Sequence, residues 1–272
     1  MMKIGNRLFD VENDCYIMGI LNVTPDSFSD GGMWNDIEKT KKHTADMIEE
    51  GAAIIDVGGE STRPGHVQIS IQEEIDRVVP AIEMIKKNFD IPVSIDSYKG
   101  QVVEAALKAG ADMVNDIWGL KYDRKVADLI AQYRIPCCLM HNREKADYSD
   151  FMADMCRDMR DSISIAKEAG IDDSQIILDP GVGFGKTYEN NLTAINQLEK
   201  LSALGYPVLL ATSRKSVIGT ALDLPTDQRV EGTIVTTVLG VQKKAAFIRV
   251  HDIKENLRAI RMTQAIMREG RK

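Results

Sequence analysis

The sequence predicts an α/β fold, a single (β/α)8 TIM barrel that spans residues 1–272. Short apolar runs alternate with longer amphipathic segments along the whole chain, and no stretch rich in Ser, Gly or Pro divides it. Most of the apolar runs end in a polar or charged residue, as expected where strands of a barrel converge on one mouth. An open doubly wound sheet is the alternative, although such sheets usually have fewer strands or a visible second domain.

Residues 1–14 precede the first repeat, and Lys3–Val11 within them predict a small β-hairpin that plugs the bottom of the barrel. The apolar runs that follow have little alternation, which is typical of parallel strands covered on both faces. The expected strands are Tyr16–Asn22, Ile54–Gly58, Val93–Asp96, Met113–Asp116, Pro136–Met140, Ile176–Asp179, Val208–Ala211 and Phe247–Val250.

The segments between these runs have helical periodicity. One apolar stripe runs from Ile71 to Ile85 and another from Met152 to Ala166. Helices are expected to stop at Gly51, Gly110 and Gly170, because each glycine stands just before the next strand.

Composition excludes several classes of protein. Hydrophobic residues make up 44% and charged residues 28% of the 272, so disorder is excluded. With 34 Lys and Arg against 41 Asp and Glu, the net charge of −7 argues against nucleic acid or an anionic membrane as the main partner. No apolar run approaches the ~18 residues of a membrane span, and residues 1–10 contain no signal-peptide core. Four cysteines without Cys-x-x-Cys spacing indicate reduced thiols in a cytoplasmic protein rather than a zinc site.

Polar residues at the strand ends form the first candidate site. Any one of them could be a turn former, but together they predict a binding site at one mouth of the barrel. They are Asn22, Asp96, Asn115, His141, Asp179, Ser213 and Arg249 with His251.

The segment from Gly181 to Thr187 looks like a phosphate-binding loop but does not have the spacing of the known glycine motifs. Three residues, not four, separate its first glycine from Gly-Lys-Thr, and Gly-x-Gly-x-x-Gly is also missed. It remains a flexible glycine loop that is either an ordinary turn or lies against a flat ligand, with Phe184 as a stacking face.

Two further segments, Met18–Gly32 and Gly51–Gly65, combine a strand with a long loop of Ser, Thr, Asp and Gly. Such loops offer hydroxyl and backbone N–H groups to an anion. Asn22 supplies a hard oxygen suited to Mg²⁺ held mostly by phosphate and water, and Arg63 adds a bidentate cation. Taken singly, each segment could also be a solvated turn.

These two segments resemble the signature stretches of the dihydropteroate synthases, enzymes of folate biosynthesis. Further landmarks stand in the family's order: Asp96, Asn115, Asp179-Pro-Gly, Ser213-Arg-Lys-Ser and Arg249-Val-His-Asp. The resemblance implies a barrel, usually a homodimer, that uses Mg²⁺ and is inhibited by sulfonamides. It also implies a reaction between 6-hydroxymethyl-7,8-dihydropterin diphosphate and p-aminobenzoate that yields 7,8-dihydropteroate and diphosphate.

The residues suit a pterin, whose ring needs acceptors for its N–H groups and donors for its carbonyl. Asp96 and Asp179 can accept, Asn115 can do both, and Lys215 can donate. The pterin diphosphate site implied by the resemblance comprises Thr62, Asp96, Asn115, Met140, Asp179, Phe184, Lys215, Arg249 and His251. His141 and Asn142 stand in a variant stretch that the resemblance leaves without a role.

Diphosphate departs with charge building on its oxygens, and Mg²⁺ at Asn22 with Arg63, Arg249 and His251 is expected to stabilise that charge. No residue is an evident nucleophile, so we expect dissociative displacement. The catalytic residues implied by the resemblance are Phe28, Asp30, Thr62, Arg63 and Lys215. Those implied for p-aminobenzoate are Phe28, Thr62, Arg63, Pro64, Phe184 and Ser213. We expect the loops 24–34 and 61–65 to close when ligands bind.

Two other functions stay open. A pterin-binding methyltransferase that serves a corrinoid protein would share Asp96, Asn115 and Asp179 but would not need a diphosphate-binding set. A non-catalytic pterin-binding barrel would be indicated by loss of Asp30, Arg63 or Lys215, and all three are present.

Overall fold

The structure is a computed structural model that describes residues 1–23, 33–60 and 68–269, with side chains of the first helix described from Ile37 onward. Its centre is a closed barrel of parallel strands in the order β10-β3-β4-β5-β6-β7-β8-β9. Pairing of β10 with both β3 and β9 closes the barrel, which excludes the open sheet. The strands are β3 (Tyr16–Asn22), β4 (Ile54–Gly58), β5 (Val93–Asp96), β6 (Met113–Asp116), β7 (Cys137–Met140), β8 (Ile176–Asp179), β9 (Val208–Leu210) and β10 (Ala245–Val250).

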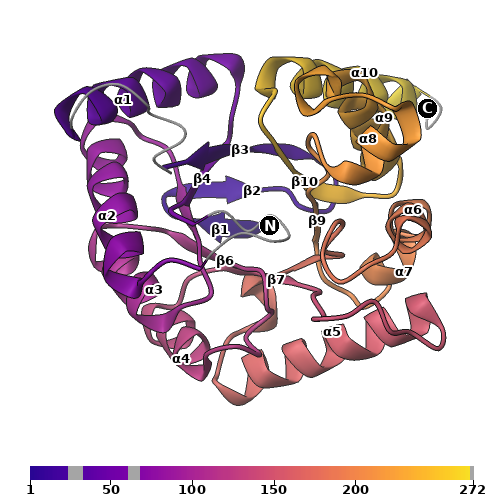
Figure 1. Cartoon of the computed structure of the whole chain (residues 1–272), viewed down its shortest axis with the longest axis horizontal. Helices are drawn as coiled ribbons and strands as arrows, with labels where there is room; N and C mark the ends of the chain where they lie inside the picture. The colour runs from indigo at the N-terminus through magenta and orange to yellow at the C-terminus, as the bar shows by residue number, and fades with distance from the viewer. Residues whose placement is uncertain (24–32, 61–67, 270–272) are drawn as a thin grey trace.

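Helices surround the strands (Figure 1), as the sequence predicts for a TIM barrel. Short 3₁₀ turns, η2 (Asp173–Gln175) and η3 (Thr226–Gln228), lie before β8 and before α9. The helices are α1 (Met33–Glu50), α2 (Ile71–Asn88), α3 (Gly100–Lys108), α4 (Arg124–Tyr133), α5 (Phe151–Glu168), α6 (Tyr188–Asn196), α7 (Glu199–Ser202), α8 (Ser216–Leu222), α9 (Val230–Gln242) and α10 (Ile253–Glu269). No helix within the described ranges is long and apolar enough to span a bilayer.

The predicted helix ends are confirmed by backbone geometry. Gly51, Gly110 and Gly170 have φ of +105°, +107° and +90° directly after α1, α3 and α5 or their cap residues. An L-residue with a side chain is strained in this region, so glycine is the residue that turns the chain from helix to strand.

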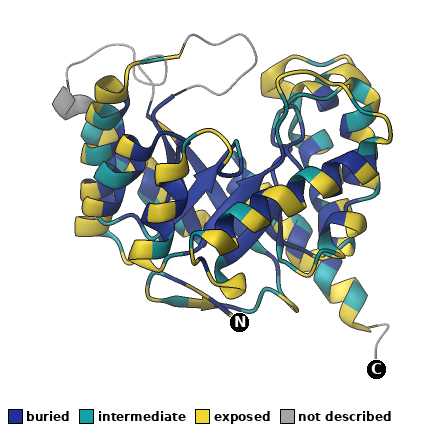
Figure 2. Ribbon diagram, turned by 90° about the horizontal axis from the view of Figure 1, so that it is seen from below, coloured by how far each residue is buried: buried dark blue, intermediate teal, exposed yellow. Residues whose placement is uncertain are grey.

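The core forms two concentric layers because side chains of a strand alternate between its faces. On β4, Ile55 and Val57 pack outward against the helices, whereas Ile54 belongs to the inner cluster. Each fully buried aliphatic side chain contributes about 1.5–3 kcal/mol. Because both faces of each strand are apolar, the sequence does not show this alternation. Figure 2 shows the buried strands enclosed by helices whose outer faces are exposed.

The predicted N-terminal hairpin is confirmed. Strand β1 (Met2–Ile4) pairs antiparallel with β2 (Arg7–Phe9), and Gly5 makes the turn at φ +59°. Met2, Ile4 and Phe9 are buried against the inner layer, which includes Ile54 and Phe247. The hairpin therefore closes the amino-terminal end of the barrel and leaves the carboxyl ends of the strands as the mouth (Figure 2).

Candidate active site

Polar side chains replace apolar ones where the strands approach the mouth. Ile54 and Phe247 face the barrel interior, so Asp56 and Arg249, two residues further along the same strands, face it as well. Asp96 and Asp179 are likewise the last residues of β5 and β8, and Asn115 is the last but one of β6. The barrel thus directs residues from most of the chain to one cup.

Arg249 is the centre of a buried ion network in this cup. Its Nε donates to Asp56 Oδ2 at 2.6 Å, and its second guanidinium nitrogen donates to Asp96 Oδ2 at 2.6 Å. Asn115 Nδ2 donates to Asp56 Oδ2 at 3.1 Å. Asp56 is fully buried and Asp96 is 9% exposed, so one guanidinium serves two desolvated carboxylates.

The electrostatics of this network favour hydrogen-bond donors from a ligand. Burial raises the pKa of Asp96 to about 7, opposed by Arg249 and reinforced by Asp56. Despite burial, the Asp56 and Asp96 carboxylates raise the pKa of Arg249. Within the described part of the chain, Asp96 Oδ1 and Asp56 Oδ1 are buried without a hydrogen-bond partner. A buried acceptor without a partner costs about 1–3 kcal/mol, so a ligand that donates there gains affinity.

Lys215 is a second buried cation, close enough to Asp179 and Asp96 to interact with both electrostatically. Its Nζ donates to the carbonyl of Val182 at 2.6 Å and lies 4.9 Å from the centre of the Phe184 ring. Burial lowers the pKa of Lys215 to about 8, and the nearby Asp179 carboxylate opposes this shift. Burial also raises the pKa of Asp179, whose Oδ1 accepts from Gly181 N–H at 2.7 Å.

One wall of the cup is apolar. Met140 clusters with Tyr98 and Ile117, and Phe184 packs against the same cluster. Aromatic and thioether side chains of this kind suit the face of a flat ring. The structure therefore brings together acceptors, a cation and an apolar wall, which are the parts that the sequence assigns to a pterin pocket.

Two of the glycines after β8 allow the chain to pack closely against a neighbouring segment. Gly181 has φ +66°, and a Cβ there would lie 1.9 Å from the carbonyl oxygen of His141. Gly185 has φ +52°, and a Cβ there would lie 2.1 Å from the carbonyl oxygen of Arg143. The loop is pressed against the segment that follows β7.

Lys186 and His141 anchor this loop. Lys186 Nζ donates to the carbonyl of Phe184 at 2.9 Å and lies 2.9 Å from His141 Nδ1. Burial lowers the pKa of Lys186 to about 7 and that of His141 to about 3, so the imidazole is neutral. Its Nδ1 then accepts from Lys186, and its Nε2 donates to Asp158 at 3.0 Å. His141, whose role the sequence leaves open, is thus engaged with Lys186 and Asp158.

The rim of the cup carries Ser213, His251 and Asn22. The Ser213 hydroxyl accepts from His251 N–H at 3.1 Å and bonds His251 Nδ1 at 2.9 Å. Asn22 is exposed at the end of β3. Its Oδ1 and Asp96 Oδ2 lie 3.6 and 3.7 Å from the point where Gly58 would carry a Cβ. The Asn22 oxygen therefore borders the acidic side of the cup.

The remaining predicted residues lie outside the described ranges. They are Phe28, Asp30, Thr62, Arg63 and Pro64. Their assignments stay predictions, as does the closing of the loops 24–34 and 61–65.

Sequence reasoning missed two residues of the site. Asp56 was given no role, although it is a charged residue inside the otherwise apolar run Ile54–Gly58, which is a usable signal. Lys186 was considered only as part of a failed nucleotide loop. Its burial against His141 depends on the contact between two loops, and sequence gives no sign of that contact.

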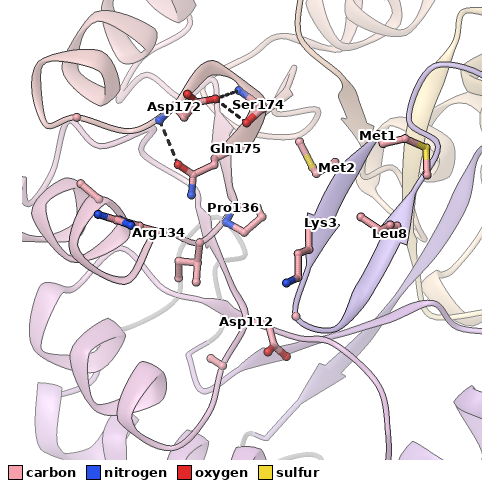
Figure 3. A pocket seen from close by; sticks show the side chains of 15 residues that line it. Met1, Met2, Lys3, Leu8, Asp112, Arg134, Pro136, Asp172, Ser174 and Gln175 are labelled. Carbon is pink, nitrogen blue, oxygen red and sulfur yellow. Dashed lines mark hydrogen bonds between the residues drawn. The ribbon is translucent and has the colours of Figure 1, made fainter.

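A cavity of about 620 Å³ lies at the opposite end of the barrel, beside the hairpin (Figure 3). Lys3, Arg134, Asp112 and Asp172 line it, with charges of both signs. Asp112 is bound to Lys86 and Asp172 to Ser174, so these acids already have partners. The cavity lacks the buried acceptors without partners that mark the cup.

The fold and the cup define an enzyme-like TIM barrel with a polar, partly unsatisfied site at the carboxyl ends of its strands. The family model described as "Pterin binding enzyme" matches residues 18–251. The chain is 59% identical over 268 residues to the dihydropteroate synthase of Clostridium beijerinckii, which covers 98% of this chain and 100% of that protein.

Solved structures agree with this match. Dihydropteroate synthase from Clostridium difficile, determined in the presence of pteroic acid, is 51% identical with a TM-score of 0.93, covering 95% of this chain and 99% of that chain. The Xanthomonas albilineans dihydropteroate synthase with 4-aminobenzoic acid is 38% identical with a TM-score of 0.93. The match covers 98% of this chain and 97% of that chain. The chain belongs to the pterin-binding enzyme family, among the dihydropteroate synthases.

Proposed function

We propose that the cup binds 6-hydroxymethyl-7,8-dihydropterin diphosphate and transfers its dihydropterin-methyl group to p-aminobenzoate, which yields 7,8-dihydropteroate and diphosphate. The observation that carries this proposal is the buried Oδ1 of Asp96, which lacks a hydrogen-bond partner among the described residues and belongs to a carboxyl group that interacts electrostatically with Lys215, as Asp179 does. Membership in the family and the bound ligands of the Clostridium difficile and Xanthomonas albilineans structures support it.

The pterin ring is oriented by the deep residues. Asp96 and Asp179 accept from the ring and amino N–H groups, and Asn115 adds an amide. Lys215 turns from the carbonyl of Val182 to donate to the ring carbonyl and nitrogen. With a pKa of about 8, Lys215 is mostly charged at neutral pH and supplies a charge-assisted bond. Met140 and Phe184 cover a face of the ring.

The diphosphate lies toward the rim. His251 and Arg63 supply donors or positive charge there, with Thr62 at the same end of the substrate, and Arg249 adds its positive charge from the deeper ion network. Asn22 suits Mg²⁺, because its oxygen is exposed and borders the acidic side of the cup. No group of three or more His, Cys, Asp or Glu among the described residues could hold a metal, so such an ion takes most of its ligands from diphosphate and water. Bound there, Mg²⁺ would neutralise charge on the diphosphate oxygens.

The reaction is a dissociative displacement. The methylene C–O bond breaks, the pterin ring stabilises the developing cation, and the amine nitrogen forms the new C–N bond and loses a proton. Lys215, Thr62 and Arg63 stabilise charge, and Asp30 and Phe28 belong to the same catalytic group. Phe28, Thr62, Arg63, Pro64 and Phe184 enclose p-aminobenzoate, and Ser213 receives its carboxylate. Sulfonamides, which resemble this amine, compete with it.

The test is a coupled assay of diphosphate release with both substrates and Mg²⁺. Release that requires p-aminobenzoate and yields 7,8-dihydropteroate by mass spectrometry supports the proposal. A protein that releases no diphosphate refutes it. Methyl transfer to a corrinoid would support the pterin-binding methyltransferase, and pterin binding without either reaction would support a non-catalytic barrel.

We also propose that the protein is a cytoplasmic homodimer. Its four cysteines are buried and unpaired, as in a reducing compartment. Val235 and Leu239 on α9, and Met262 and Ile266 on α10, are 37–63% exposed and spaced four residues apart on each helix. A second copy would cover these apolar side chains. Light scattering after size exclusion should give twice the 30.2 kDa of the chain, and Val235→Glu should lower it.

A further inference from the structure

The loop between β8 and α6 contains a lysine to which the proposed function gives no role. Lys186 stands two residues before α6, and its side chain turns back onto its own loop. Its Nζ donates to the carbonyl of Phe184 at 2.9 Å and lies 2.9 Å from Nδ1 and 3.3 Å from the carbonyl oxygen of His141. An ammonium has three N–H donors, so these three acceptors occupy all of them. Lys186 is therefore directed at the protein rather than at a phosphate.

His141 is a fixed partner for this lysine. It is 1% exposed, it directly follows β7, and its N–H donates to the carbonyl of Asp179 at 2.9 Å, which continues the pairing of β7 with β8. Its Nε2 lies 3.0 Å from Asp158 on α5, and Arg143 holds the same carboxylate at 2.6 Å. The imidazole is thus attached both to the barrel and to a surrounding helix, and Lys186 ties the loop to it.

The residue that Lys186 holds is part of the cup. The Phe184 side chain packs against the cluster that contains Met140, and its ring centre lies 4.9 Å from Lys215 Nζ. Phe184 is only half-buried, so packing does not enclose it on every side. Its backbone is held instead, because its N–H donates to the carbonyl of Gly181 at 3.1 Å and its carbonyl accepts from Lys186. These bonds fix the backbone from which the ring projects.

We propose that Lys186 and His141 are positioning residues for Phe184, and that they hold its ring where it covers a face of the pterin. This inference rests on the proposed function, which assigns Phe184 to the substrate. It gives the glycine segment a physical role, because the lysine after its last glycine binds a carbonyl of the same loop instead of a phosphate. Gly185 permits this arrangement, since a Cβ there would lie 2.1 Å from the carbonyl oxygen of Arg143.

The test separates the contact of His141 with Lys186 from its contact with Asp158. In His141→Asn, the side-chain oxygen is as many bonds from the backbone as Nδ1 and can accept from Lys186. In His141→Gln, the amide nitrogen replaces Nε2 and can donate to Asp158, but the acceptor for Lys186 is lost. Lys186→Met removes the ammonium itself. Its control is Lys86→Met on α2, which removes an ion pair with Asp112 at 2.7 Å outside the cup.

The Kd of the pterin diphosphate substrate, measured by calorimetry, should rise about fivefold in Lys186→Met and in His141→Gln, because the aromatic contact loses its fixed place. His141→Asn and Lys86→Met should stay within about twofold of the wild-type value, because the bonds that hold Phe184 are kept.

A double-mutant cycle shows whether Lys186 acts through the Phe184 ring. Phe184→Ala alone should raise the Kd about fivefold through loss of the aromatic contact. Adding Lys186→Met to Phe184→Ala should then change the Kd less than about twofold further, because both changes remove the same contact. Adding Lys186→Met to Asn115→Ala should give its full increase of about fivefold, because Asn115 binds Asp56 and shares no partner with the loop.

Amide hydrogen exchange in peptides covering 181–187 gives a second measurement that needs no substrate. Exchange should become faster in Lys186→Met and His141→Gln and stay unchanged in His141→Asn and Lys86→Met. If Lys186→Met fails to fold, the two His141 variants decide, because both keep the ammonium.

Three outcomes would overturn the inference: additive losses in Lys186→Met with Phe184→Ala, equal pterin affinities of His141→Gln and His141→Asn, or unchanged exchange in the loop. A wild-type protein that binds no pterin refutes the proposed function instead, and the exchange measurement then still tests whether Lys186 and His141 hold the backbone of Phe184.

Discussion

Replacing Arg249 by methionine should destabilise the protein strongly, because it removes the guanidinium shared by Asp56 and Asp96. Both carboxylates are 2.6 Å from the guanidinium nitrogens, and both are buried. Removing one partner of a buried ion pair costs about 3–5 kcal/mol, a large share of a typical stability of about 5–15 kcal/mol. At ~2.1 cal/mol/K per residue, the 272 residues give an unfolding entropy near ~0.6 kcal/mol/K, so Tm at pH 7 should fall by about 5–9 °C.

The loss should depend on pH with a definite sign. The pKa of Asp96 is about 7 in the folded protein, above its value of ~3.9 in an unfolded chain. The folded state therefore binds more protons between these values, and the contribution of Asp96 to stability falls as pH rises through this range. Without Arg249 the pKa rises further. The loss of stability in Arg249→Met relative to wild type should thus be largest above pH 7. It should become smaller toward pH 5, where Asp96 is protonated.

The assay is thermal unfolding by circular dichroism without ligands at pH 5, 6, 7 and 8. Arg258→Met, at an exposed position on α10, is the matched control and should leave Tm nearly unchanged. Adding Asp96→Asn to Arg249→Met should restore part of the stability, because only Asp56, and no longer Asp96 as well, then remains buried without a cationic partner. A fall in Tm below about 2 °C at pH 7, or a deficit that does not change with pH, would refute the reasoning.

Three further predictions concern the cup. Asp179→Asn and Lys215→Ala should each raise the Kd for the pterin substrate more than about tenfold, because a buried partner is left unpaired; unchanged affinity in calorimetry would contradict the pocket. Asn22→Ala should weaken Mg²⁺-dependent diphosphate binding, and a metal titration with the same midpoint as wild type would exclude this role. Gly181→Ala should destabilise more than Gly170→Ala by at least ~2 kcal/mol, since both have positive φ but only Gly181 faces a carbonyl at 1.9 Å; equal losses in urea unfolding would be inconsistent with the packed loop.

The strands were predictable because each buried parallel strand is a short apolar run with a polar end. Five of the eight have the predicted bounds, among them Tyr16–Asn22 and Ile176–Asp179. The other three differ by one or two residues. Pro136, for example, has no N–H to pair and precedes β7. Closure of the sheet followed from counting the repeats, because eight strand–helix units close at this size.

The site was predictable where a functional residue ends a strand and unpredictable where contacts between loops decide. Asp96, Asn115 and Asp179 face one cup because parallel strands bring their carboxyl ends to one side. Asp56 lies two residues before the end of β4, opposite Ser94 in β5, and only the side-chain hydrogen bonds show that it shares Arg249 with Asp96. Lys186 meets His141 across two loops, and no local pattern specifies that distance.

The distribution of charge in the cup orients the substrate. Asp56, Asp96 and Asp179 are 0%, 9% and 3% exposed, so the deep part of the cup carries three acids against Lys215 and Arg249. An anion placed there would meet desolvated carboxylates, whereas a neutral heterocycle rich in N–H groups meets acceptors, two of which lack a hydrogen-bond partner among the described residues. Asn22 and His251, which lie nearer the solvent, are exposed and half-buried. For the proposed substrate, this distribution favours the ring in the deep part of the cup and the diphosphate toward the rim, where charge leaving the methylene moves away from the acids.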